Sequence, residues 1–250
     1  MNKAMIFAAG LGTRLAPITD CRPKALVELK GRTLLWHVAE RLEAEGVHDL
    51  TINVHHFANQ IKDYVSSGPF AEWVQNRGIA IKISDESEQL LDTGGGLRKA
   101  APLIFAQDDN PVLIHNVDIM SNAHLDELYH SIGEADAMLL VSQRETSRYL
   151  LFDNHMRLRG WQNIKTGEVR PSTLQSQPSN LKTLTPLAFS GIHVVSKHLT
   201  EAMNEWPDRF GIIDFYIETC NRLNIRGLVQ PDLMLTDIGK IDVLRALEEG

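Results

Sequence analysis

Cysteine is scarce in this sequence: only Cys21 and Cys220 occur in 250 residues, far apart and outside any CxxC spacing. A disulfide framework and a structural zinc site therefore have no support, and we expect the reduced thiols of a cytoplasmic protein. Long apolar runs are also missing, and the N-terminus leads directly into a short strand pattern. No secretion signal, membrane-spanning segment or membrane partner is therefore expected.

The sequence also lacks an excess of positively charged residues. The 25 lysines and arginines face 32 aspartates and glutamates, which gives a formal net charge of -7. Because a nucleic-acid backbone requires a concentrated basic face, no nucleic-acid partner is expected. Low-complexity linkers and internal repeats are absent, and 43% of the residues are hydrophobic. This composition predicts one globular domain over residues 1–250.

What the sequence does contain is an alternation of strand and helix patterns in its first half. Short apolar strand patterns occupy residues 4–7, 50–54, 79–83 and 111–114. Helical spacing lies between them, at residues 34–45, 57–65 and 95–101. The alternation predicts an α/β fold with a doubly wound, mostly parallel mixed sheet, Rossmann-like in its winding. Ligands of such sheets bind beyond the carboxyl ends of the strands, so the loops there should share one rim.

Beyond residue 135 the pattern changes to strands separated by polar turns. These strands are expected at residues 137–141, 149–152, 156–161 and 187–195, and later elements at 211–223 (helix), 225–229 (strand) and 241–247 (helix). We expect the middle group to form a small antiparallel extension that holds a second substrate. Residues 165–182 are polar and lack periodicity, which predicts a mobile loop.

A glycine-rich turn with two cations follows the first strand. Residues 10–15 read GLGTRL, and Lys24 follows a proline shortly afterwards. A dinucleotide fingerprint would need a third glycine where Leu15 stands, and a P-loop would need Gly-Lys-Ser/Thr, so neither class fits. A bare backbone that presents N–H groups, with Arg14 and Lys24 beside it, instead suits a polyphosphate.

These residues resemble a known family. The run AAGLGTRLAPITDCRPKALVEL at residues 8–29 resembles the nucleotide-binding motif of the sugar-1-phosphate nucleotidyltransferases. Four later stretches resemble further motifs of the family: LDTGGGLRKA (91–100, second nucleotide loop), HNVDIM (115–120, metal-binding strand end), FSGIHVVS (189–196, acceptor strand) and LTDIGKIDVLRA (235–246, second metal motif). The acidic-TGGG form is most similar to the N-acetylmuramate-1-phosphate uridylyltransferase branch, with mannose-1-phosphate guanylyltransferase-like proteins as close relatives.

The resemblance implies roles for particular residues. It makes Arg14, Lys24 and Asp118 catalytic, and it makes Asp118 and Asp237 the ligands of a Mg²⁺ cofactor, which prefers such hard oxygen donors. The nucleotide-binding residues that it implies are Ala8, Ala9, Gly10, Gly12, Thr13, Arg14, Lys24, Thr93, Gly94 and Gly95. Asn116 and Gly191 are implied for the acceptor.

The implied reaction joins an NTP and a sugar 1-phosphate into an NDP-sugar and releases pyrophosphate. Residues 1–120 would bind the nucleotide and residues 121–250 the sugar phosphate. UTP with N-acetylmuramate 1-phosphate is the leading pair. Guanylyl transfer to mannose- or heptose-1-phosphate, cytidylyl transfer to phosphocholine and a non-enzymatic nucleotide-sugar sensor are the alternatives. The base, the sugar, the number of metal ions and the oligomeric state stay open.

Two adjacent histidines, His55 and His56, follow the second predicted strand. Neighbouring residues of an extended chain point to opposite faces, so the pair cannot easily chelate one zinc ion. We expect one of the two to lie near the base or the acceptor.

Overall fold

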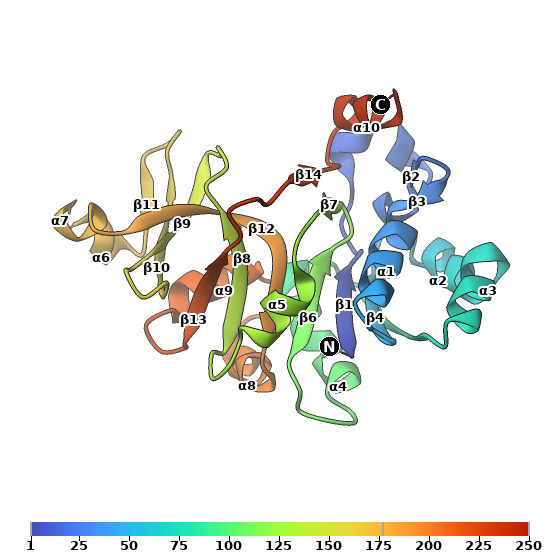
Figure 1. Ribbon diagram of the computed structural model, residues 1–250, viewed down its shortest axis with the longest axis horizontal. Coiled ribbons are helices and arrows are strands. Elements are labelled where there is room, and N and C mark those ends of the chain that lie inside the picture. The colour runs from blue at the N-terminus through green and yellow to red at the C-terminus, as the bar shows by residue number, and fades with distance from the viewer. Residues whose placement is uncertain (1, 177, 250) are drawn as a thin grey trace.

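The computed structural model describes residues 2–176 and 178–249 and contains one large mixed sheet (Figure 1). Eight of its ten strands form a continuous path, in the spatial order β11 (Glu168–Arg170), β10 (Leu158–Asn163), β9 (Arg148–Phe152), β12 (Thr185–Val195), β6 (Val112–Asn116), β1 (Lys3–Phe7), β4 (Asp49–Val54) and β5 (Ala80–Asp85). The other two strands are β8 (Ala137–Ser142), which pairs with β12, and β13 (Ile225–Val229), which pairs with β8. Two small ladders stand apart from this sheet: β2 (Glu28–Leu29) with β3 (Arg32–Thr33), and β7 (Ile119–Ser121) with β14 (Leu235–Asp237).

Ten α-helices are described. They are α1 (Leu34–Ala44), α2 (Ala58–Ser66), α3 (Gly68–Asn76), α4 (Asp92–Ile104), α5 (Leu125–His130), α6 (Ser172–Gln175), α7 (Pro178–Leu181), α8 (Lys197–Ala202), α9 (Ile212–Thr219) and α10 (Ile241–Glu249). Short 3₁₀ turns are η1 (Thr13–Leu15), η2 (Ile18–Asp20), η3 (Lys24–Leu26) and η4 (Met203–Glu205). Within the described residues, no helix combines the length and the apolar character needed to cross a bilayer.

The centre of the sheet is parallel and covered on both faces. β1 pairs in parallel with β4 and β6, and β4 with β5. Successive side chains of a strand point to opposite faces, so Ala4 and Ile6 join one apolar cluster while Met5 and Phe7 join the other. Helices α1 and α5 contribute to the first cluster, and α4, α8 and α9 to the second. The doubly wound α/β fold predicted from the sequence is confirmed.

The second half adds the antiparallel extension. The first residues of β12 pair antiparallel with β9, and its last residues pair antiparallel with β6. Strands β10 and β11 continue the antiparallel order outward from β9. Figure 1 shows β9, β10 and β11 at the end of the molecule opposite to α2 and α3. Strands were expected in this region, and they are confirmed.

The mobile loop predicted over residues 165–182 is wrong as a description of most of that segment. It contains β11, α6 and α7, while residue 177 lies outside the described residues. These elements are three or four residues long, so none completes a period that a sequence pattern could reveal. Long-range contacts fix β11 instead, since Arg170 forms ion pairs with Asp214 (2.7 Å) and Glu218 (3.3 Å) on α9.

A buried histidine makes the stability of the fold depend on pH. His193 on β12 is 1% exposed, its ring lies 5.9 Å from that of Tyr216 on α9, and neither ring nitrogen has a partner among the described residues. Burial, and secondarily the charge of His115, lowers the pKa of His193 from 6.5 to about 3. In the unfolded chain His193 therefore binds a proton near pH 6.5, whereas in the folded chain it stays neutral until a much lower pH. Protonation thus favours the unfolded chain and destabilises the fold as the pH falls.

We expect the free energy of unfolding to fall between pH 6.5 and pH 4, with His193 contributing up to about 1.4 kcal/mol per pH unit. His193→Leu should flatten this slope, whereas His48→Leu, at an exposed position, should leave it unchanged. Urea denaturation of the three proteins at several pH values, followed by circular dichroism, measures the slopes. Equal slopes for the wild type and His193→Leu would show that this histidine is not responsible.

Candidate active site

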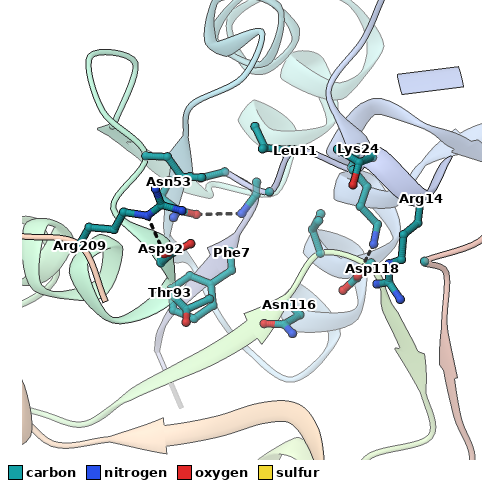
Figure 2. A pocket seen from close by; sticks show the side chains of 18 residues that line it. Phe7, Leu11, Arg14, Lys24, Asn53, Asp92, Thr93, Asn116, Asp118 and Arg209 are labelled. Atoms are coloured by element: carbon teal, nitrogen blue, oxygen red, sulfur yellow. Dashed lines mark hydrogen bonds and ion pairs between the residues drawn. The ribbon is translucent and has the colours of Figure 1, made fainter. Parts of the chain in front are cut away.

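A hollow of about 440 Å³ lies at the carboxyl ends of β1 and β6 (Figure 2). It gathers most of the site residues that the sequence predicted: Ala8, Ala9, Gly10, Gly12, Thr13, Arg14, Lys24, Thr93, Asn116 and Asp118. Residues that the sequence analysis did not name also line it, among them Asn53, Leu90, Asp92, Arg209 and Gly239. Its position agrees with the rim expected for a parallel α/β sheet. We call this hollow the rim pocket.

The glycine-rich turn presents open backbone to the rim pocket. The N–H groups of residues 9–12 donate no hydrogen bond within the part of the chain that the structure describes. A Cβ atom at Gly10 would meet nothing within 4 Å, whereas one at Gly12 would lie 3.0 Å from the Lys24 and Thr19 side chains. Gly12 also has φ +67°, a conformation that favours glycine. The turn therefore packs closely against Lys24 while its N–H groups stay available for an anion.

Lys24 and Asp118 meet at one side of the rim pocket (Figure 2). The Lys24 ammonium forms a close ion pair with a carboxylate oxygen of Asp118, and the two side chains are only 9% and 18% exposed. Asp118 follows β6, and η3 begins at Lys24. Two segments that are 94 residues apart are thus joined by a partly desolvated charge pair.

The second predicted metal ligand approaches from the C-terminal part of the chain. β14 pairs with β7, so that Asp237 lies opposite Ile119, and the Ile238 N–H donates to the Asp118 carbonyl oxygen at 2.8 Å. Asp237 itself is not among the lining residues of the rim pocket. Its carboxylate lies 3.9 Å from the guanidinium of Arg14, which does line the pocket. The β7–β14 ladder therefore brings Asp237 next to the turn that carries Asp118.

The donor set can be compared with the needs of Mg²⁺. Among the described residues, no group of three or more His, Cys, Asp or Glu side chains is placed to hold a metal ion. A cage made of protein ligands alone is therefore not found in that part of the chain. Mg²⁺ commonly takes one or two carboxylates and completes its shell with phosphate oxygens and water. Asp118 and Asp237 lie on adjoining segments beside the glycine-rich turn, and two such carboxylates fit that requirement.

Gly94 and Gly95, predicted to bind the nucleotide, have a packing role in the structure, and their nucleotide-binding role stays a prediction. They do not form a loop before a helix but lie in the first turn of α4, and the structure does not place them in the lining of the rim pocket. Their N–H groups donate to the Phe210 carbonyl oxygen at 2.9 and 3.3 Å, so these donors are already used. A Cβ atom at Gly94 would lie 2.2 Å from the Phe210 ring, and one at Gly95 would lie 2.2 Å from the Asp208 carbonyl oxygen. The glycines let α4 approach the segment before α9.

Asn53 and Glu86 form a buried network behind the rim pocket. Asn53, at the end of β4, accepts the Ala8 N–H at 2.8 Å and donates to the Glu86 carboxylate at 2.8 Å. Glu86 is 0% exposed, and burial raises its pKa. The Leu91 N–H donates to its other oxygen at 3.3 Å. The network ties the glycine-rich turn to β4 and to the start of α4.

We expect Asn53→Ala to raise the KM for the nucleotide about tenfold and to lower the free energy of unfolding by about 1–3 kcal/mol. It would leave the buried Ala8 N–H and the Glu86 carboxylate without their partner. Asn59→Ala, at an exposed position on α2, is the matched control. Nucleotide titrations and urea denaturation measure the two effects. An unchanged nucleotide KM in a folded Asn53→Ala variant would show that the network does not shape the pocket.

The predicted acceptor residues lie together at the end of β6. A Cβ atom at Gly191, which has φ +80°, would lie 2.6 Å from Asn116 Nδ2, so glycine is required here for close contact. Neither His55 nor His56 is among the lining residues of the rim pocket. His55 Nδ1 instead lies 2.7 Å from the Glu86 carbonyl oxygen, and the His56 ring is 4.0 Å from that of Phe57. The expectation that one of these histidines lies near the base or the acceptor stays a prediction.

Arg209 is a lining residue that sequence reasoning missed. Its guanidinium donates to Asp92 at 2.8 Å across a sequence separation of 117 residues (Figure 2). No local pattern marks such a residue, because an isolated arginine in a loop is ordinary. Asn53 could have been found, since it stands at the end of a predicted strand, where ligands of such sheets bind.

Residues 3–149 match the nucleotidyl transferase family. The chain belongs to this family. Among curated proteins it is 38% identical over 206 residues to the N-acetylmuramate alpha-1-phosphate uridylyltransferase of Caulobacter vibrioides, covering 79% of this chain and 76% of the relative. It is 33% identical over 150 residues to the mannose-1-phosphate guanyltransferase of Gibberella zeae, covering 59% of this chain but 39% of that protein.

Solved structures agree with this nucleotidyltransferase in fold. HddC from Yersinia pseudotuberculosis, in a complex with GMP-PN, superposes with a TM-score of 0.73 at 20% identity, covering 100% of this chain and 99% of the other. A UDP-glucose pyrophosphorylase in a complex with UDP-glucose superposes with a TM-score of 0.76 at 14% identity, covering 100% and 97%. The resemblance to the family that the sequence motifs indicated is confirmed.

Proposed function

We propose that this nucleotidyltransferase transfers a uridylyl group from UTP to N-acetylmuramate 1-phosphate or a closely related amino-sugar phosphate. The observation that carries the proposal is the 38% identity over 206 residues to a uridylyltransferase with that acceptor in its name. The proposed products are a UDP-sugar and pyrophosphate. Both cysteines are free thiols, in keeping with a cytoplasmic site of reaction, where UTP is available.

The chemistry proposed for the rim pocket is an in-line displacement. An oxygen of the sugar phosphate attacks the α-phosphorus of UTP, and the bond from that phosphorus to the oxygen leading to the β-phosphate breaks, which releases pyrophosphate. The reactants are both anions, so the protein must align them and neutralise their charge. The open N–H groups of residues 9–12, together with Arg14 and Lys24, would bind the triphosphate and the developing charge.

Asp118 and Asp237 would hold a Mg²⁺ ion beside this triphosphate. When bound, the ion supplies positive charge to the phosphate oxygens without any proton transfer. Lys24, which is paired with Asp118, lies at the same side of the rim pocket and would contribute a further positive charge to the triphosphate.

A kinetic screen tests the proposal. UTP, GTP, CTP, ATP and dTTP are each combined with N-acetylmuramate 1-phosphate, mannose 1-phosphate, glucose 1-phosphate and phosphocholine in the presence of MgCl₂, and pyrophosphate release is measured. We expect the highest kcat/KM for UTP with N-acetylmuramate 1-phosphate, by at least tenfold over every other pair. A higher value for another pair would overturn this assignment.

Guanylyl transfer to mannose 1-phosphate is the second candidate. The 33% identity to the Gibberella zeae guanyltransferase over 150 residues favours it, although the match covers only 39% of that protein. The GTP and mannose 1-phosphate arm of the screen distinguishes the two candidates directly.

A further inference from the structure

A second hollow of about 390 Å³ lies on the antiparallel extension, between β9, β10, β12 and the start of α9. Three arginines line it, together with two aromatic rings and one carboxylate: Arg144, Arg148, Arg170, Trp161, Phe189 and Asp214. We call it the arginine cavity. Figure 1 shows β9 and β10 in the left part of the molecule, where β12 leads toward β6.

The charges of the arginine cavity are not balanced. Arg170 is neutralised by Asp214 and Glu218, and these carboxylates raise its pKa. Arg144 donates only to the Phe189 carbonyl oxygen, at 3.0 Å, and has no carboxylate partner within the described chain. The Arg148 guanidinium is exposed and has neither an ion pair nor a hydrogen bond among residues 2–176 and 178–249. Two positive charges are thus available to an anionic ligand.

The arginine cavity adjoins the rim pocket along two segments. On one side, a Cβ atom at Gly191 of β12 would lie 2.6 Å from Asn116 of the rim pocket, and Phe189 of the cavity stands two positions earlier in the same strand. On the other side, Arg209 lines the rim pocket and Asp214 lines the cavity, five positions later. The arginine cavity is therefore the neighbouring hollow on the side of the rim pocket where Asn116 lies.

We infer that the arginine cavity binds a second anionic group of the acceptor, a carboxylate carried on the sugar and separate from its 1-phosphate. Arg148 and Arg144 would hold the carboxylate, because a guanidinium matches its two oxygens with two donors. The Trp161 ring would pack against the sugar. The cavity would then select sugar 1-phosphates that bear an acid group and reject neutral ones.

This inference rests on the proposed function, and it adds a reason for the choice of sugar. N-acetylmuramate 1-phosphate is N-acetylglucosamine 1-phosphate with a lactyl ether, which ends in a carboxylate. Mannose 1-phosphate has no such group. The unpaired arginines therefore favour the first of the two acceptor classes.

The test compares the two N-acetylated sugar 1-phosphates as acceptors for the full chain, with UTP as donor. Arg148→Gln keeps an exposed polar side chain but removes the charge, and Arg144→Gln does so at the second position. Arg222→Gln, at an exposed position outside the cavity, is the matched control. For Arg148→Gln we expect the KM of the acidic sugar to rise about 10–100-fold, as for a lost charged hydrogen bond. The KM of UTP and the kcat/KM of the neutral sugar should change less than twofold.

The outcomes separate this inference from the proposed function. If Arg148→Gln and Arg144→Gln leave the preference for the acidic sugar unchanged, or reduce the use of both sugars equally, the inference is wrong while the uridylyl transfer stands. If the wild type uses the acidic sugar with another NTP, the proposed base is wrong, and the same comparison with that NTP decides on the cavity. If the wild type accepts only neutral sugar phosphates, both are rejected.

Discussion

Replacing Asp118 by asparagine should lower kcat for nucleotidyl transfer by about 10³-fold or more, equivalent to about 4 kcal/mol of transition-state stabilisation. Asparagine keeps the shape of the side chain but removes its negative charge. The charge holds the Lys24 ammonium at the edge of the rim pocket, and it is one of the two carboxylates that fit Mg²⁺. Pyrophosphate release under saturating substrates measures the loss.

Two controls make this result specific. Asp63→Asn, on the exposed surface of α2, should retain the activity of the wild type. Thermal unfolding of Asp118→Asn should show a cooperative transition, since the amide oxygen can still accept a hydrogen bond from Lys24. Activity near that of the wild type in a folded Asp118→Asn variant would show that the Asp118 charge is not needed for catalysis.

Replacing Gly95 by alanine should destabilise the protein by about 2–3 kcal/mol without any ligand present. In most helices the change from glycine to alanine stabilises by up to about 1 kcal/mol. Here the added Cβ would lie 2.2 Å from the Asp208 carbonyl oxygen, which is backbone and cannot rotate away. Overpacking of this kind, together with the loss of the hydrogen bonds to the Phe210 carbonyl oxygen, outweighs the gain in helix propensity.

Urea denaturation of the ligand-free protein measures the effect of Gly95→Ala, and Gly10→Ala is the comparison. Nothing lies within 4 Å of a Cβ atom at Gly10, so that variant should unfold at a urea concentration close to that of the wild type. A Gly95→Ala variant as stable as the wild type would show that this glycine is not needed for packing.

The parallel core could be predicted because its elements are long and buried. β1 is an apolar run after Lys3, β4 alternates apolar residues with polar ones, and α1 repeats its buried residues at helical spacing, so each pattern is complete within one element. The β7–β14 ladder escaped prediction, since each strand has three residues and depends on a partner more than 100 residues away. The short elements within residues 165–182 were not predicted either, because each has only three or four residues.

The candidate site was predictable where the chain itself brings the parts together. Gly10, Gly12, Arg14 and Lys24 lie within one short stretch, and the structure places them around one pocket. The packing role of the three glycines after Thr93 could not be predicted, because glycine serves close packing of two segments as readily as contact with a ligand. Arg209 comes to the rim pocket only through the tertiary fold, so no short stretch of sequence predicts its place there.

The stereochemical course at the α-phosphorus tests the central claim most directly, namely that the rim pocket aligns two phosphates for one in-line displacement. The reaction is run with the Sp isomer of uridine 5′-O-(1-thiotriphosphate), and the configuration of the thio-substituted UDP-sugar is determined by ³¹P NMR. The account predicts inversion, because the acceptor attacks the α-phosphorus opposite to the departing pyrophosphate. Retention would mean two displacements through a covalent nucleotidyl-enzyme, and it would contradict the account.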